Sequence, residues 1–192
     1  MRYEAGHKQQ TSKRILRAAG RLFRKQGYAA TSVDAVMASA QLTAGAFYSH
    51  FRSKEDLLAE TLDAVFREAS SDRPEQLSTL QGGEWLRAFT AFYLSQEHRD
   101  AVDRGCPMPA LAAEVARIGG RTREVFEQHL HRVIEFIAAQ FDERHPDRRR
   151  AISTTAMLAG AVLLARAVSD ESISREILST CREAVMEKIE PQ

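Results

Sequence analysis

Residues 43–54, with the sequence TAGAFYSHFRSK, combine side chains suited to contact with a partner and side chains suited to burial. At the spacing of a helix, Phe47 and Phe51 fall on one apolar side. The opposite side carries Gly45, Tyr48 and further small residues. A surface of small residues lets a helix press closely against a flat or grooved partner. The same pattern would also suit an ordinary core helix with a weak outer face.

A second short helix is predicted immediately before this stretch. In the run TSVDAVMASA, Thr31 and Asp34 have the spacing of a capping box. After a short turn, Thr43 is expected to cap the next helix through its hydroxyl. Leu42 and Phe47 have the spacing of a hydrophobic staple across that cap. Two short helices joined by a tight turn predict a helix-turn-helix.

Charged residues are unevenly distributed along the 192-residue chain. Residues 1–54 contain ten lysines and arginines but only two acidic residues, a formal charge of +8. The remainder has 17 basic and 24 acidic residues, a formal charge of −7. A basic end joined to an acidic body is expected of a phosphate-binding head on a body that does not bind phosphate. The simpler alternative is a solvated basic helix face.

The sequence lacks the motifs of catalysis and of metal binding. No HExxH, GxSxG, GxGxxG or Walker pattern is present, and His129 and His131 fall on nearly opposite sides of a helix. Cys106 and Cys181 form no CxxC pair. The polar N-terminus does not resemble a signal peptide, and the apolar run 156–165 is too short to cross a membrane. We therefore predict a cytoplasmic protein that is not an enzyme and that uses no metal, cofactor or membrane.

The run from Gly27 to Leu58 closely resembles the DNA-binding region of the TetR family of bacterial transcriptional regulators. The resemblance is strongest over residues 11–66, and beyond them it extends only to the general helical layout. Two positions depart from the family pattern. Gln41 stands where glycine is usual, so a left-handed backbone there would carry strain, and Met37 replaces a small alanine. The matching positions are Gly27, Thr31, Val36, Ala40, Leu42, Thr43, Gly45, Tyr48, Phe51, Lys54 and Leu57.

The resemblance implies double-stranded DNA as a partner and assigns roles within this region. The residues expected at base edges in the major groove are Thr43, Ala44, Gly45 and Ser49. The residues expected to hold phosphates are Thr31, Ser32, Thr43, Tyr48, His50 and Lys54. Gln41, in the turn, is the one side chain of this face with the potential for a bidentate base contact. Specificity is therefore expected to rest on thymine-methyl contacts and on DNA shape.

The chain is predicted to be all-α, with a three-helix head and a larger helical domain. The head, residues 1–53, is the helix-turn-helix DNA-binding domain, and residues 54–192 form the effector-binding and dimerisation domain. The first ten residues are expected to be a flexible arm that precedes a helix over residues 11–26. Further helices are predicted at about 53–69, 84–96, 109–118, 121–141, 147–168 and 174–188.

Two further sets of residues are candidates for binding within the larger domain. The apolar run 156–165 must be buried on nearly every face, and a second copy is expected to cover one side, together with the last helix. The family resemblance implies the same four-helix interface. The candidate interface residues are Met157, Ala161, Leu164, Ala165, Val168, Ile177, Cys181 and Val185. The candidates for contact with an effector, which would equally suit a plain core, are Trp85, Phe89, Phe92, Tyr93, Cys106, Met108, Phe126 and His129.

These features predict a ligand-responsive repressor. It would bind a palindromic operator as a homodimer and leave it when a small apolar or aromatic effector binds. One alternative is a thiol switch in which oxidation or electrophile attack at Cys106 releases DNA, with Arg104 nearby to favour the thiolate. Another is a ligand-binding or enzymatic body whose head is vestigial.

Overall fold

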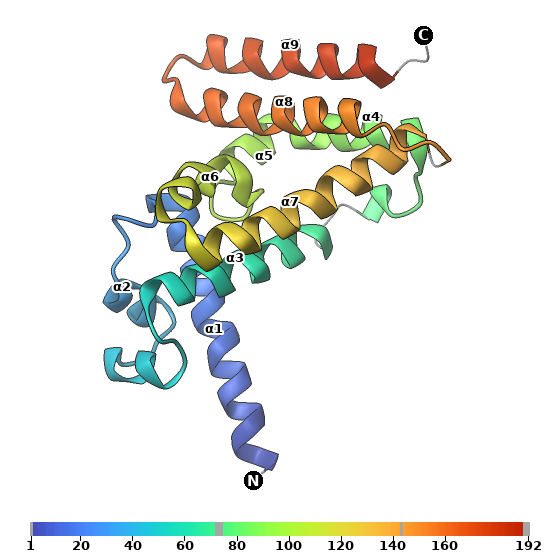
Figure 1. The fold of residues 1–192 in the computed structure, drawn as a ribbon. Coiled ribbons are helices and arrows are strands. Elements are labelled where there is room, and N and C mark those ends of the chain that lie inside the picture. The colour runs from blue at the N-terminus through green and yellow to red at the C-terminus, as the bar shows by residue number, and fades with distance from the viewer. Residues whose placement is uncertain (1, 72–74, 143, 190–192) are drawn as a thin grey trace. The chain divides into compact units, whose positions relative to one another are not determined.

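Every regular element that the computed structural model describes is a helix, which confirms the predicted all-α fold class. The described residues are 2–71, 75–142 and 144–189. In chain order the elements are α1 (Arg2–Gln26), α2 (Val33–Ser39), the 3-10 helix η1 (Ala44–Ser49), α3 (Lys54–Ser71), the 3-10 helix η2 (Glu75–Leu77), α4 (Gly82–Tyr93), α5 (Gln96–Asp100), α6 (Pro107–Ile118), α7 (Gly120–Phe141), α8 (Arg148–Ala167) and α9 (Glu171–Ile189) (Figure 1).

Helix α1 begins at Arg2, so the segment predicted as a flexible arm is helical instead. Residues 2–10 contain no proline, and apart from Gly6 they include residues of good helix propensity such as Glu4, Ala5 and Lys8. Because nothing in residues 2–10 breaks a helix, α1 extends through this polar segment. The amphipathic stripe predicted for residues 11–26 is present as well, since Ile15, Ala19 and Phe23 are fully buried.

The described chain forms two compact units. The first comprises Met1–Ser70 and Cys106–Glu127, and the second comprises Ser71–Gly105 and Gln128–Gln192. These units differ from the two functional domains predicted with a boundary at residue 53. The difference arises because most of α3, all of α6 and the first part of α7 pack with the head helices. The functional boundary itself stays a prediction.

The core of the first unit joins all the elements of the head. Its fully buried side chains come from each of them: Ile15, Phe23, Val36, Met37, Phe47, Phe51, Leu57, Leu58 and Leu62. Gly20 of α1 sets how closely α1 and α3 approach each other. A methyl group added at Gly20 would lie 2.7 Å from Cγ1 of Val65, which is closer than real side chains come. Helix α3 is therefore held firmly against α1.

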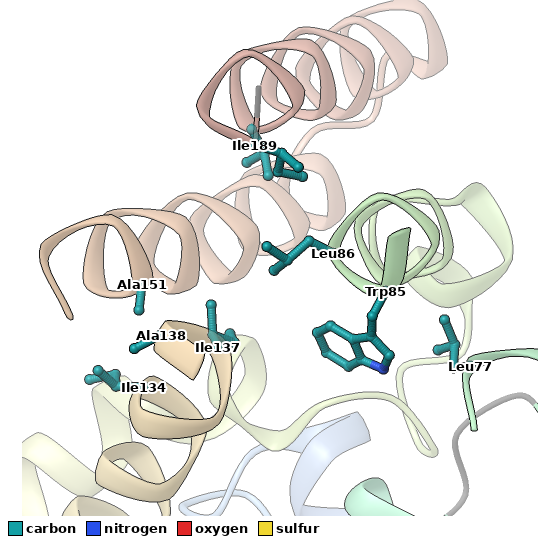
Figure 2. Packing of buried hydrophobic residues seen from close by; sticks show 9 residues of the cluster. Leu77, Trp85, Leu86, Ile134, Ile137, Ala138, Ala151 and Ile189 are labelled. Atoms are coloured by element: carbon teal, nitrogen blue, oxygen red, sulfur yellow. The ribbon is translucent and has the colours of Figure 1, made fainter. Parts of the chain in front are cut away.

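The second unit has its own core between α4, α7, α8 and α9. Trp85 and Leu86 of α4 are buried there with Ile137 of α7, and Ala138 of α7 lies near Ala151 of α8 (Figure 2). Helices α8 and α9 pack side by side along their length (Figure 1). Within the described ranges, no helix is both long enough and apolar enough to cross a membrane.

Candidate nucleic-acid interface

Helix α2 begins one residue later than its capping pattern suggests. The N-cap is Ser32, whose Oγ accepts a hydrogen bond from the Ala35 N–H at 3.1 Å. Thr31 is instead 0% exposed, and its Oγ1 donates to the Gly27 carbonyl oxygen at 2.7 Å. The Thr31 hydroxyl thus stabilises the end of α1. Contrary to the prediction, the Thr31 side chain cannot contact a phosphate, because it is fully buried.

The turn after α2 places Gln41 in the left-handed region, with φ 56°. This is the conformation expected at a position where the family pattern has glycine, and it costs a side-chain-bearing residue energy that glycine avoids. The Leu42 N–H donates to the Met37 carbonyl oxygen at 2.9 Å and closes the end of α2. The Arg14 guanidinium of α1 donates to the Ala40 carbonyl oxygen at 2.6 Å. The turn is therefore held from two sides.

The predicted recognition helix is a 3-10 helix, η1, rather than an α-helix. Thr43 occupies the N-cap in an extended conformation, but its side chain makes no capping hydrogen bond, which differs from the prediction. The first turn is closed by the backbone instead, since the Ala46 N–H donates to the Thr43 carbonyl oxygen at 3.1 Å. The Thr43 side chain is exposed and is not used in capping, so it is available to a partner.

Segment η1 has the two unlike sides that its sequence predicts. Phe47 and Phe51 are each 1% exposed, with ring centroids 5.7 Å apart. On the other side Tyr48 is 77% exposed, and no atom lies within 4 Å of the place that a Cβ at Gly45 would take. The open face also includes the exposed residues Thr43, Ala44 and Ser49.

Lys54 opens α3 next to an aromatic ring. Ser53 caps this helix as its spacing predicts, because Ser53 Oγ accepts from the Asp56 N–H at 3.0 Å. The Nζ of Lys54 lies 4.2 Å from the centroid of the Tyr28 ring, a cation–π contact. Tyr28 was not among the residues predicted for this site, because a tyrosine that follows a helix end carries no signal of a lysine 26 positions later.

Basic side chains on the surface of α1 add positive charge to this unit. Arg24 is an exception, because it is 7% exposed and its Nε donates to the Gly20 carbonyl oxygen at 2.9 Å. Burial and the charge of Lys8 lower the pKa of His50 below its ordinary value. His50 is therefore expected to be mainly neutral near pH 7. The exposed basic residues are Lys8, Lys13, Arg14, Arg17, Arg21 and Lys25.

The candidate effector residues are divided between the two units. Cys106, Met108 and Phe126 belong to the first, where Phe126 contacts Phe66 with ring centroids 5.7 Å apart. The other five belong to the second. There the rings of Trp85 and Phe89 are stacked at 4.6 Å.

The stacked pair belongs to a longer chain of ring contacts in the second unit. Phe89 contacts Tyr93 at 5.5 Å, and Tyr93 contacts His98 at 4.5 Å. Phe136 packs edge-on against Trp85 at 4.9 Å. Sequence reasoning missed His98 and Phe136, since His98 lies in a polar segment and Phe136 falls outside the apolar stripe of its helix.

The candidate dimer residues are also of two kinds. Ala161, Ala165 and Val185 are at most 2% exposed within a single copy of the chain. They pack inside the second unit and offer no surface to another copy, which corrects their assignment. Leu164 and Val168 are exposed, at 57% and 36%. The half-buried members of the set are Met157, Ile177 and Cys181.

Residues 15–61 match the family model described as bacterial regulatory proteins, tetR family. Over 45 residues the chain is 47% identical to an uncharacterized HTH-type transcriptional regulator, YerO of Bacillus subtilis. Over 52 residues it is 44% identical to the HTH-type transcriptional regulator AcrR of Shigella flexneri. The matched segments are 23% and 27% of this chain and span only 16% and 24% of those relatives.

Solved structures resemble the chain over almost its whole length. A TetR-family transcriptional regulator from Agrobacterium tumefaciens has a TM-score of 0.79 at 22% identity, covering 96% of this chain and 100% of that one. The reduced form of NemR from E. coli has a TM-score of 0.78 at 21% identity, covering 93% and 96%. At these identities the likeness establishes the fold alone.

The strained turn gives a prediction about stability. Gln41→Gly should raise the free energy of unfolding by about 0.5–1 kcal/mol, because glycine removes the steric cost of the left-handed backbone. Ala38→Gly, at an exposed helical position of α2, is the control and should lower it by about 1 kcal/mol. Urea unfolding measures both. Destabilisation of similar size in the two variants would show that the turn stores no strain at Gln41.

Proposed function

We propose that this chain, whose residues 15–61 match the tetR family model of bacterial regulatory proteins, is a transcriptional regulator that binds double-stranded DNA through η1. The observation that carries the proposal is the open face of η1. Phe47 and Phe51 hold one side in the core, while Tyr48 and the space beside Gly45 are open. A short helical segment with small outward residues can enter the major groove closely enough to reach base edges.

The surroundings of η1 support phosphate contacts on either side of the groove. Lys54 lies in the first turn of α3, where the helix dipole and the ammonium both attract an anion. The proposed interface keeps Ser32, which is exposed, and leaves out the buried Thr31. Base edges would be met by Thr43, Ala44, Gly45 and Ser49, with Gln41 at the margin, and phosphates by Ser32, Thr43, Tyr48, His50 and Lys54. Such a face favours recognition by thymine methyls and DNA shape.

The proposed partner of α8 and α9 is a second copy of this chain. Leu163 and Leu164 of α8 are 50% and 57% exposed, and Ile173 of α9 is 46% exposed. On the same helix as the leucines, a Cβ at Gly160 would meet no atom within 4 Å. An exposed apolar face on two adjacent helices suits self-association about a twofold axis. Such a dimer would present its two η1 segments to half-sites about 34 Å, or a multiple of that, apart.

Release from DNA is proposed to follow the binding of a small apolar or aromatic effector. The aromatic contacts of Trp85, Phe89 and Tyr93 in the second unit support an effector of that character. The effector must bind more tightly to the conformation in which the η1 segments are wrongly spaced, because a ligand with equal affinity for both conformations shifts nothing. As a regulator of bacterial genes, the dimer would act in the cytoplasm and repress its target.

One observation favours a thiol switch as the second candidate. Cys106 is the N-cap of α6, and a helix N-terminus stabilises a thiolate. One of the structures that this chain resembles is NemR in its reduced form. Burial raises the pKa of the Cys181 thiol, which disfavours its reactive thiolate.

The role of η1 is tested at Gly45. Gly45→Leu should weaken DNA binding on the order of a hundredfold, because the added side chain would occupy the space between η1 and the groove. Gly45→Ala should cost much less. Fluorescence anisotropy, with a duplex that the wild-type protein selects from a random-sequence pool, measures both. The melting temperature should stay unchanged, since the space is open in the free protein. Wild-type affinity in Gly45→Leu would exclude η1 from the interface.

Self-association is tested at Leu164. Leu164→Glu should convert the dimer to single copies at micromolar concentration, because a charge would be buried without a partner at the interface. The fold of the single copy should survive, as the side chain is 57% exposed. Sedimentation equilibrium gives the mass. Ala112→Glu places the same charge on an exposed position of α6 and should leave the dimer intact. A dimeric Leu164→Glu variant would locate the interface elsewhere.

The thiol switch is tested by two matched substitutions. If it operates, Cys106→Ser abolishes the loss of DNA binding caused by hydrogen peroxide, while Cys181→Ser keeps it, and both bind DNA like the wild type when reduced. Anisotropy with and without the oxidant distinguishes them. An unaltered response in Cys106→Ser would remove this candidate and leave the effector-released regulator.

A further inference from the structure

A carboxylate from α6 holds the loop that joins α1 to α2. Oε2 of Glu114 accepts a hydrogen bond from the Tyr28 N–H at 2.6 Å, and Oε1 accepts one from the Ala29 N–H at 3.1 Å. All three residues belong to the first compact unit. Two consecutive amides directed at one carboxylate form charge-assisted hydrogen bonds, which are stronger than bonds between neutral groups. The backbone of this loop is thus fixed by a residue about 85 positions away.

The loop is built to admit this carboxylate. Gly27, directly before Tyr28, has φ 84°, a conformation that favours glycine. A Cβ at Gly27 would lie 3.3 Å from Oε1 of Glu114, which is tighter than ordinary contact. Gly27 therefore both turns the chain out of α1 and leaves room for the Glu114 side chain.

Tyr28 connects the clamped loop to a proposed DNA contact. Its amide bonds to Glu114, while its ring lies 4.2 Å from the Lys54 ammonium and contacts the Phe23 ring at 5.5 Å. The ring has Phe23 as a fixed neighbour in the core. The place of Tyr28 therefore determines where the Lys54 ammonium is held at the start of α3.

A second tie in the same unit joins α7 to α3 and is weaker. Arg121 of α7 pairs with Asp56 and lies 3.7 Å from Glu60, both on α3. The Arg121 side chain is 57% exposed, and an ion pair so open to water contributes little. The Glu114 hydrogen bonds join a carboxylate to backbone amides next to a half-buried side chain. They are therefore expected to contribute more to stability than the exposed Arg121 ion pair.

We propose that Glu114 is a positioning residue for DNA binding, which acts through Tyr28 to hold the Lys54 ammonium where it meets a phosphate. This inference rests on the proposed function and names a positioning residue for the same interface.

For Glu114→Gln, the loss of negative charge and the loss of the positioning role predict opposite changes in DNA affinity. A carboxylate repels DNA phosphates, so loss of its charge would by itself tighten DNA binding. Glu114→Gln also breaks one of the two clamp hydrogen bonds, because the glutamine Nε2 is a donor and cannot accept from a backbone N–H. A positioning role therefore predicts weaker binding. Glu124→Gln, at an exposed position of α7 in the same unit, removes the same charge and is the matched control.

The experiment measures the affinity of full-length variants for a duplex selected by the wild-type protein, over a range of salt concentrations. Glu114→Gln should weaken binding on the order of tenfold, whereas Glu124→Gln should leave it unchanged or slightly tighter. The slope of log affinity against log salt should fall by about 0.9 for each phosphate that the variant no longer neutralises. In a Lys54→Ala background, Glu114→Gln should cause no further weakening, because the two act in series.

The Tyr28 ring provides an independent pair of variants, should Glu114→Gln fail to fold. Tyr28→Phe keeps the π face and should bind like the wild type. Tyr28→Leu keeps apolar bulk against Phe23 but should reproduce both the weaker affinity and the lower salt slope. Equal binding by Tyr28→Phe and Tyr28→Leu would overturn the inference. The inference would also be overturned if Glu114→Gln bound DNA with the same affinity as Glu124→Gln. The same holds if Glu114→Gln weakened binding equally in the wild-type and Lys54→Ala backgrounds. Failure of the wild-type protein to select any duplex would instead reject the proposed function itself.

Discussion

The recognition segment cannot hold its own shape. Six residues in a 3-10 helix have too few internal hydrogen bonds to persist alone, and η1 has no side-chain cap at Thr43. Its conformation depends on the burial of Phe47 and Phe51 in a core that α1, α2 and α3 share. The close approach of α1 and α3 at Gly20 and the hydrogen bond from Arg14 to the end of α2 complete that framework. Burial of Phe47 and Phe51 therefore fixes the conformation of η1. This conformation keeps the opposite, open face exposed to a partner.

Polar side chains in the first unit serve two distinct purposes. Some are used within the fold: Thr31 is bonded to Gly27, and Arg24 is bonded to Gly20. Others remain at the surface, such as Lys13 and Arg17 on α1. The division does not follow residue type, because arginine and threonine occur in both groups. A count of basic residues therefore overstates how many of them face solvent.

The features that could be predicted from the sequence are those encoded locally. Helical spacing and turn chemistry were enough to identify the helix-turn-helix and the two sides of η1. The left-handed backbone at Gln41 was suggested only by the family resemblance, which has glycine at that position. The cap of α2 was displaced by one residue because Thr31 and Ser32 are equally good caps in sequence, and burial decided between them. The clamp of Glu114 on Tyr28 has no local signature at all. Ala161 and Val185 were assigned to a dimer because an apolar pattern does not distinguish burial within one copy from burial between two.

The winding of η1 changes which side chains act together. A 3-10 helix turns about 120° per residue, so positions three apart lie in one line, whereas in an α-helix they would be offset by about 60°. Gly45 and Tyr48 therefore form one column along η1, and Ala46 and Ser49 form the next. If contact residues from a DNA-binding protein with an α-helical recognition helix were substituted at the corresponding positions of η1, their side chains would point in different directions. Redesign of its sequence preference has to treat residues three apart as a single unit.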